Sequence, residues 1–129
     1  MDINITFGGG LKINATCEGH TIYSDQPVKG GGENSAPDPF TLFLSSIGMC
    51  AGYFVLKFCQ SRNIPTSDIQ VSLNSDFNRT LHVAENIRID IKLPADFPEK
   101  YHNALLKSVD QCTVKKTILH GPEISVNLT

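Results

Sequence analysis

Apolar and polar residues alternate along the first 24 residues of the chain. The first apolar row comprises Ile3, Ile5 and Phe7. After a run of three glycines, the second row comprises Leu11, Ile13, Ala15 and Cys17. A period of two is typical of strands with one buried face, and glycines favour tight turns, so the pattern predicts a β-hairpin. Residues 21–23 predict a short third strand after the turn at 18–20.

A loop and a long apolar segment follow. Residues 25–39 are rich in Gly, Pro, Asn and Asp, which predicts a loop, and long ordered loops are often functional. Asp38 is predicted to be the N-cap of a helix that has Pro39 at its first position. From Phe40 to about Gln60 nearly every residue is apolar or small, and no charge occurs from Pro39 through Leu56. This segment predicts one long helix.

The apolar helix reaches the lower limit of a membrane span in length. The serines and glycines within it reduce its hydrophobicity, Lys57 interrupts it, and no basic cluster sets an orientation. We therefore predict no membrane span but the central helix of a soluble core, which is apolar on every side. In a chain this small, a second copy is needed to cover such a helix on every side, so we predict a homodimer.

Alternation returns after Asn63–Pro65, where the long helix is predicted to end. Residues 69–74 and 87–93 predict two antiparallel strands, and a second helix is predicted to begin near Pro94. The apolar stripe of this helix comprises Phe97, Tyr101, Ala104, Leu105, Ser108, Val109 and Cys112. A short turn and Pro122 precede a last predicted strand with Ile124, Val126 and Leu128 on one face. The order βββ–α–ββ–α–β predicts a single α+β domain over residues 1–129.

Composition narrows the function classes. The 129 residues are 40% apolar and 19% charged with a net charge of -2, which is typical of one globular domain and gives no basic surface for nucleic acid. The start of the chain lacks the pattern of a secretory signal, so we predict a cytoplasmic protein with reduced cysteines. The cysteines form no C-x-x-C pair and the histidines lack zinc-ligand spacing, which predicts no metal site.

Cys50 lies between Gly48 and Gly52 in the long helix. Each glycine costs a helix about 1 kcal/mol relative to alanine, so the pair indicates a close backbone approach or a helix break. With a break near Gly48, Cys50 would lie in the first turn of a new helix, where free N–H groups lower the pKa of a thiol. The alternative is that Cys50 is a small buried apolar residue.

Cys112 is predicted at the inward face of the end of the second helix, followed by Lys115 and Lys116, whose charges favour a thiolate. Its alternative is again core packing. Cys50 and Cys112 together form a plausible redox pair in which one thiol attacks and the other resolves. Cys17 and Cys59 are interpreted as structural. The four histidines are interpreted as surface residues.

Two segments resemble the OsmC/Ohr superfamily of osmotically inducible and organic hydroperoxide resistance proteins. Residues 31–50, reading GGENSAPDPFTLFLSSIGMC, are similar to its glycine-rich loop, hydrophobic helix and reactive cysteine. Residues 112–118, reading CTVKKTI, are similar to its second-cysteine motif. The resemblance covers nearly the whole chain, and the two segments stand in the same order as in the family.

The resemblance implies an intertwined α+β homodimer with central hydrophobic helices between sheets and active sites at the subunit interface. It implies that Cys50 attacks an organic hydroperoxide, becomes a sulfenic acid and then forms a disulfide with Cys112. A dithiol reductant such as a lipoylated protein would reduce the disulfide, and no metal or organic cofactor would be needed. Such a protein belongs to the oxidative stress response.

The sequence departs from the family at two positions. Peroxidase members carry a Glu where Thr41 stands here, and an Arg from an N-terminal segment, whereas this chain has no Arg before Arg62. The predicted pocket and supporting residues beside Cys50 are Thr41, Phe43, Met49, Tyr53 and Phe54. The departures support an alternative function, a dimer that binds a small apolar ligand or senses redox state. A third hypothesis is a dimerisation module with inert thiols.

Overall fold

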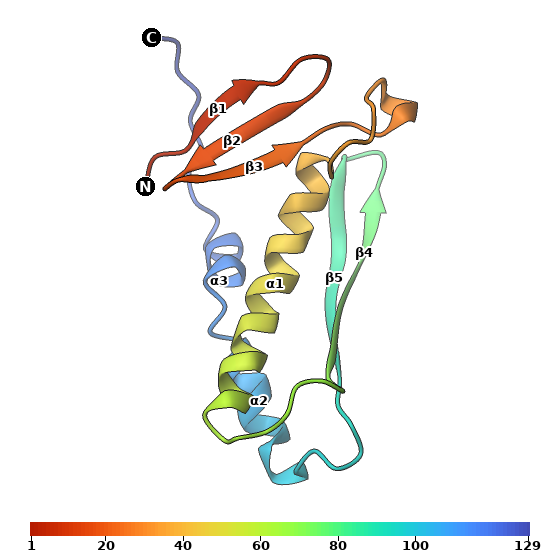
Figure 1. Cartoon of the computed structure of the whole chain (residues 1–129), viewed down its shortest axis with the longest axis vertical. Coiled ribbons are helices and arrows are strands. Elements are labelled where there is room, and N and C mark those ends of the chain that lie inside the picture. The colour runs from red at the N-terminus through yellow and green to blue at the C-terminus, as the bar shows by residue number, and fades with distance from the viewer. The chain divides into compact units, whose positions relative to one another are not determined.

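A computed structural model describes all residues, Met1–Thr129, and its elements are labelled in Figure 1. The strands are β1 (Asn4–Phe7), β2 (Ile13–Cys17), β3 (His20–Ser24), β4 (Gln70–Asn78) and β5 (Val83–Lys92). The α-helices are α1 (Pro39–Gln60), α2 (His102–Val109) and α3 (Thr113–His120). Short 3-10 helices occupy Val28–Gly30 and Glu99–Tyr101. The chain forms two compact units, Met1–Leu44 and Ser45–Thr129. The α+β class is confirmed.

The first unit contains an antiparallel sheet in the order β1-β2-β3. Ala15 lies opposite Ile5 on one side and Ile22 on the other, so the predicted apolar rows share one face. Gly9 and Gly10 adopt positive φ angles in the turn between β1 and β2, which explains the glycine run. The predicted hairpin and third strand are confirmed.

The loop after β3 is organised around the carboxylate of Asp25, which is 1% exposed. It accepts hydrogen bonds from the backbone N–H groups of Gln26, Glu33 and Ser35 and from the Ser35 hydroxyl. These bonds, led by those from Ser35, lower the pKa of Asp25 to about 2. Gly32 closes the loop, because a Cβ there would lie 2.1 Å from the carbonyl oxygen of Gln26. One ionised side chain thus holds both ends of the loop.

Helix α1 begins as predicted. Asp38 Oδ1 accepts from the N–H groups of Phe40 and Thr41 at 3.0 Å each, which makes Asp38 the N-cap. The helix continues unbroken to Gln60, so of the two alternatives for the glycines the break near Gly48 is wrong. An added Cβ at Gly48 would lie 3.8 Å from the Leu73 Cβ, an ordinary contact distance, so no close approach requires the glycine. The helix stays continuous because its face with Ile47, Ala51 and Val55 is buried, which outweighs the low helix propensity of the glycines.

The core of the second unit forms where α1 packs against β4, β5 and α2. Its buried residues are Ala51, Val55, Phe58, Cys59, Phe97, Leu105 and Val109. β4 and β5 pair antiparallel, as predicted, with Leu73 opposite Ile89. α1 is the one helix with the length and composition of a membrane span. Its inner face nevertheless packs in this core, as the predicted central helix should.

The C-terminal quarter differs from the prediction in two places. The second helix ends at Val109, and Cys112 lies outside it in an extended conformation (φ -51°, ψ 116°) that starts α3. The predicted turn through Val114 and Ile118 is therefore a helix. The predicted last strand does not form: Ile124, Val126 and Leu128 are 85, 92 and 102% exposed. A strand needs backbone hydrogen bonds to a neighbouring strand, and none joins residues 121–129 to a strand.

Candidate functional site

The two candidate cysteines come together in the second unit, although 61 positions lie between them. Cys50 is half-buried in the middle of α1, and Cys112 is 1% exposed immediately before α3. Their side chains are hydrogen-bonded to each other, and both thiols are free. The start of α3 therefore lies against the middle of α1 and brings the two thiols together.

Cys112 is the N-cap of α3. Its Sγ accepts a hydrogen bond from the backbone N–H of Lys115 at 3.4 Å, the bond that a serine or aspartate oxygen makes at most helix starts. The Gly121 backbone, with φ of 68°, ends the same helix. The sulfur of Cys112 thus has a structural partner in addition to Cys50.

The two thiols have opposite protonation preferences. Burial pushes the pKa of Cys50 upward, but hydrogen bonds from the Cys112 thiol and from the backbone N–H groups of Val114 and Thr113 outweigh it, and the pKa is lowered. Burial, together with the hydrogen bond to Cys50, raises the pKa of Cys112. Cys50 is therefore the thiol of the pair that ionises more readily, and Cys112 is the thiol that donates a hydrogen bond to it.

The helix N-terminus that lowers the Cys50 pKa is that of α3. The sequence pointed to free N–H groups at a break in α1, but these groups come from a different helix. Thr113 and Val114 are the first two residues of α3, and their N–H groups have no partner within that helix. A run with Val114 and Ile118 four residues apart and Gly121 beyond it is the sequence signal that could have revealed α3.

No cationic side chain acts on Cys50. Lys115 Nζ pairs with Asp110 Oδ1 at 2.5 Å, and Arg62 stacks on the Phe58 ring with its guanidinium carbon 3.6 Å from the ring centroid. Lys29 belongs to the first unit, and Arg79 lies in the exposed turn between β4 and β5. The lowered pKa of Cys50 accordingly arises from hydrogen bonds that outweigh the effect of burial, without a nearby positive charge.

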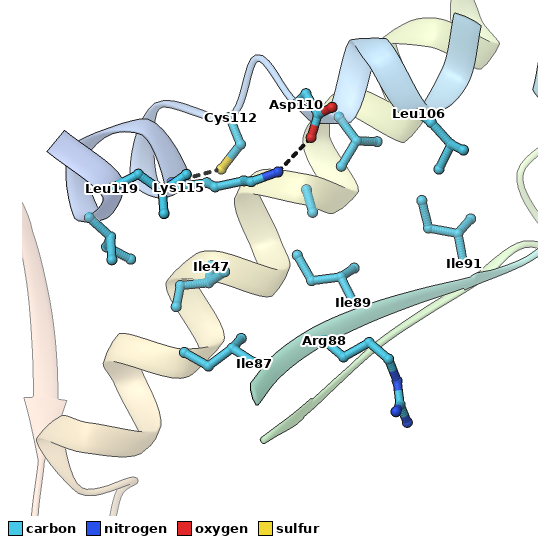
Figure 2. A pocket seen from close by; sticks show the side chains of 13 residues that line it. Ile47, Ile87, Arg88, Ile89, Ile91, Leu106, Asp110, Cys112, Lys115 and Leu119 are labelled. Carbon is cyan, nitrogen blue, oxygen red and sulfur yellow. Dashed lines mark hydrogen bonds and ion pairs between the residues drawn. The ribbon is translucent and has the colours of Figure 1, made fainter. Parts of the chain in front are cut away.

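Beside the thiol pair lies an apolar groove of about 560 Å³ between α1, β5 and α3. Figure 2 shows Ile87 and Ile89 of β5 facing Ile47 of α1, with Leu119 of α3 nearby. Cys112 lines the groove, whereas Cys50 does not. Its polar lining comprises Arg88, Asp110 and Lys115. The groove thus includes Cys112 in its lining but not Cys50.

All five predicted pocket residues lie on α1. Met49 and Tyr53 are exposed on α1 at 66 and 54%, and the Phe54 ring meets the Tyr53 ring edge-on at 5.3 Å. Thr41 donates its hydroxyl to Asp38 Oδ2 at 2.7 Å. The Phe43 ring stacks with Phe40.

Thr41 precedes Cys50 by nine residues, which on a continuous helix places the two on opposite faces. None of the five predicted pocket residues lines the groove.

The family model of OsmC-like proteins matches residues 31–127. Comparison with curated proteins finds no significant match.

Several solved structures share the fold. A protein from Psychrobacter arcticus 273-4, named for osmotic stress and detoxification responses, has a TM-score of 0.75 at 18% identity, covering 89% of this chain and 85% of that protein. An OsmC-like protein from Mycoplasma pneumoniae has a TM-score of 0.71 at 18% identity, covering 99 and 94%. An organic hydroperoxide resistance protein from Legionella pneumophila has a TM-score of 0.56 at 16% identity, covering 91 and 87%.

Proposed function

We propose that this chain, which belongs to the OsmC-like family, is a thiol-dependent peroxidase that reduces organic hydroperoxides. The observation that carries the proposal is the pairing of Cys50 and Cys112 with oppositely shifted pKa values. A peroxidase of this type needs one thiolate to attack and one protonated thiol beside it to resolve. A family neighbour named as an organic hydroperoxide resistance protein supports the same class of substrate.

The proposed reaction begins at the Cys50 sulfur. The thiolate attacks the terminal oxygen of the hydroperoxide, the O–O bond breaks, and the alkoxide leaves and takes up a proton as an alcohol. Cys50 is then a sulfenic acid. The sulfur of Cys112 attacks the Cys50 sulfur, its proton and the hydroxyl leave together as water, and a Cys50–Cys112 disulfide forms. A dithiol reductant, such as a lipoylated protein, transfers two electrons and two protons to restore both thiols and becomes a disulfide itself.

In this proposal, the start of α3 does what the Arg–Glu pair does in the peroxidases that the sequence resembles. The backbone N–H groups of Thr113 and Val114 stabilise the thiolate, so neither a Glu at the position of Thr41 nor an N-terminal Arg is required for nucleophilicity. Preorganised N–H donors at a helix start stabilise an anion because they need not reorient when the charge develops. No metal or organic cofactor takes part.

We also propose that the working unit is a soluble, cytoplasmic homodimer. One face of α1 carries Met49, Tyr53 and Leu56, all exposed, around Gly52, at which an added Cβ would meet no atom within 4 Å. Residues 49, 52, 53 and 56 share one helix face, and an apolar stripe with a glycine in its centre suits close packing on a second helix. The same face borders Cys50, so a second copy would form a wall of the peroxide site.

The test is a thiol count before and after one equivalent of cumene hydroperoxide, with peptide mapping of the oxidised protein. Rapid loss of two thiols and recovery of a Cys50–Cys112 peptide are the expected results. Cys50→Ser should abolish hydroperoxide consumption, whereas Cys59→Ser, the matched control at another buried thiol, should leave it unchanged apart from stability. Survival of all four thiols in the folded protein would refute the peroxidase.

A second candidate is a dimer that binds a small apolar ligand or senses redox state. The groove of about 560 Å³ beside Cys112 and the hydrogen-bonded Thr41 at the position of the family Glu favour it. The number of equivalents of hydroperoxide consumed distinguishes the two functions. A peroxidase consumes many equivalents when dithiothreitol is present. A sensor or binding protein stops after one equivalent or reacts with none.

A further inference from the structure

Two aromatic residues follow Cys50 by one turn of α1. Tyr53 and Phe54 stand three and four positions after Cys50 on the unbroken helix, so they project on either side of it. Their rings nevertheless meet edge-on, with centroids 5.3 Å apart. Side chains that start about 100° apart around a helix axis reach each other only above the strip of surface between them. That strip is the one on which Cys50 lies.

The direction in which helical side chains lean places the ring pair over Cys50. Side chains of an α-helix lean towards its N-terminus, so the two rings cover the turn before them, which holds Cys50. The turn after them holds Lys57 on the same strip. Cys50 is half-buried. The ring pair of Tyr53 and Phe54 thus covers the thiol from α1, whereas the hydrogen bonds to its sulfur come from Cys112 and the start of α3.

Tyr53 adds an exposed hydroxyl to the surroundings of Cys50. Of the four residues one turn away from the thiol on α1, Ile47 and Phe54 are apolar, and Ser46 and Tyr53 carry hydroxyls. Ser46 is half-buried and precedes Cys50, so by the same lean its side chain is directed away from the thiol. Tyr53 is 54% exposed, and its hydroxyl makes no hydrogen bond within the chain. This hydroxyl is therefore available to a molecule that approaches Cys50 from solvent.

The proposed peroxidase reaction requires a proton donor at the leaving oxygen. When the O–O bond breaks, charge develops on the inner oxygen of the hydroperoxide, and an alkoxide is a poor leaving group unless it is protonated. The backbone N–H groups of Thr113 and Val114 and the Cys112 thiol all donate to the Cys50 sulfur. In the proposed reaction, Cys112 then uses its proton in the second step. None of these groups serves the leaving oxygen.

We propose that Tyr53 is the general acid of the reaction and donates the proton of its hydroxyl to the leaving oxygen of a hydroperoxide bound against the Tyr53–Phe54 ring pair. The inference rests on the peroxidase of the proposed function and adds a catalytic residue to it. The Cys50 thiolate attacks the terminal oxygen, and the electron pair of the broken O–O bond goes to the inner oxygen. The phenol proton moves to the same oxygen and gives the alcohol. The tyrosinate then takes a proton from water.

This role complements that of α3. A phenol is a stronger acid than an alcohol, so proton transfer from Tyr53 to the alkoxide is favourable. The start of α3 stabilises the thiolate before the reaction, and Tyr53 acts on the oxygen that leaves. Together they supply the two effects that an arginine beside a reactive thiol combines in one side chain, namely stabilisation of the thiolate and donation to the peroxide.

The test uses Tyr53→Phe, which removes the hydroxyl and keeps the ring, and three reagents that differ in their leaving groups. Cumene hydroperoxide releases an alkoxide, peracetic acid releases acetate, which is a stable anion, and iodoacetamide releases iodide. Loss of the free Cys50 thiol is followed by rapid quenching and mass spectrometry. Because general acids contribute about 10²–10⁴-fold, Y53F should react at least tenfold more slowly than wild type with cumene hydroperoxide. It should react at the wild-type rate with the other two reagents.

The matched control is Tyr23→Phe at an exposed tyrosine of β3, which should keep wild-type rates with all three reagents. Circular dichroism and sedimentation check that Y53F keeps the fold and oligomeric state of the wild type. The comparison among reagents is made within one variant, so a general change in the accessibility of Cys50 would affect all three rates.

Two results would overturn the inference and keep the peroxidase. One is an equal rate for Y53F and wild type with cumene hydroperoxide. The other is a similar decrease in Y53F with all three reagents, which would mean that Tyr53 only packs beside the thiol. A wild-type protein whose Cys50 reacts with iodoacetamide but not with cumene hydroperoxide would refute the peroxidase itself, and the general acid with it.

Discussion

Replacing Thr113 by proline tests whether the start of α3 stabilises the Cys50 thiolate. Thr113 is the first residue of α3, where the N–H has no partner within the helix and proline is the favoured residue. Cys112, the preceding residue, has ψ of 116°, which is the extended conformation that a following proline requires. T113P therefore removes one N–H donor to Cys50 and leaves α3 intact.

The expected size of the effect follows from the hydrogen bonds at the sulfur. A hydrogen bond to a charged group contributes about 1.5–3 kcal/mol, and 1.36 kcal/mol corresponds to one pKa unit. Cys50 is half-buried and keeps two other donors, Val114 and Cys112, so the lower end of this range applies. T113P should raise the pKa of Cys50 by about one unit, because it weakens stabilisation of the charged form.

The assay is the rate of iodoacetamide alkylation of Cys50 between pH 5 and 10, followed by mass spectrometry of the Cys50 peptide. The control is Thr113→Ala, which removes the same side chain and keeps the N–H. T113P should shift the midpoint of the pH profile upward, T113A should not shift it, and the thermal unfolding temperature of T113P should equal or exceed that of T113A. A folded T113P with the same midpoint as T113A would refute the account of thiolate stabilisation by α3.

Three further perturbations follow from the same structure. Cys112→Ser keeps a capping oxygen for α3 but removes the resolving sulfur, so excess hydroperoxide should drive Cys50 to a sulfinic acid, seen as a mass gain of two oxygen atoms. Asp25→Asn should destabilise the protein. Because the folded-state pKa of Asp25 is about 2 against an ordinary 3.8, the stability difference from wild type in urea unfolding should be full above pH 3.8 and disappear as the pH falls towards 2. Gly32→Ala, which puts a Cβ 2.1 Å from the Gln26 carbonyl oxygen, should lower the free energy of unfolding by more than about 2 kcal/mol, whereas Gly48→Ala, whose Cβ would lie 3.8 Å from the Leu73 Cβ, should not lower it. An unchanged pH profile for D25N, or equal unfolding free energies for the two glycine variants, would contradict these expectations.

Local patterns were sufficient to predict most of the fold. The Asp38–Pro39 start and the uncharged run after it predicted α1 almost to the residue, and alternation predicted every strand that pairs within the chain. The juxtaposition of Cys50 and Cys112 was anticipated from resemblance and chemistry.

Tertiary packing explains the points where local reasoning failed. The glycines around Cys50 suggested a close backbone approach or a broken helix, but burial of the helix face with Ile47, Ala51 and Val55 compensates for their low helix propensity. Cysteine is not a recognised capping residue, and the apolar stripe of α2 continues through Val109 to Cys112. The sequence pattern therefore did not indicate that a new helix, α3, starts after Cys112. Residues 122–128 show the converse limit, because alternation predicts a strand there without identifying a neighbouring strand for it.

The double role of the Cys112 sulfur, as helix cap and as partner of Cys50, links protein folding to redox potential. A disulfide sulfur is a poorer hydrogen-bond acceptor than a thiol held towards Lys115, so oxidation would leave α3 without its cap. Losing an N-cap costs about 1 kcal/mol, and for a two-electron couple about 1.4 kcal/mol corresponds to 30 mV. The capped dithiol would therefore be favoured by roughly 20 mV, which makes the disulfide a better oxidant of its reductant. The same helix start that makes Cys50 reactive would thus also help return the protein to its reduced form.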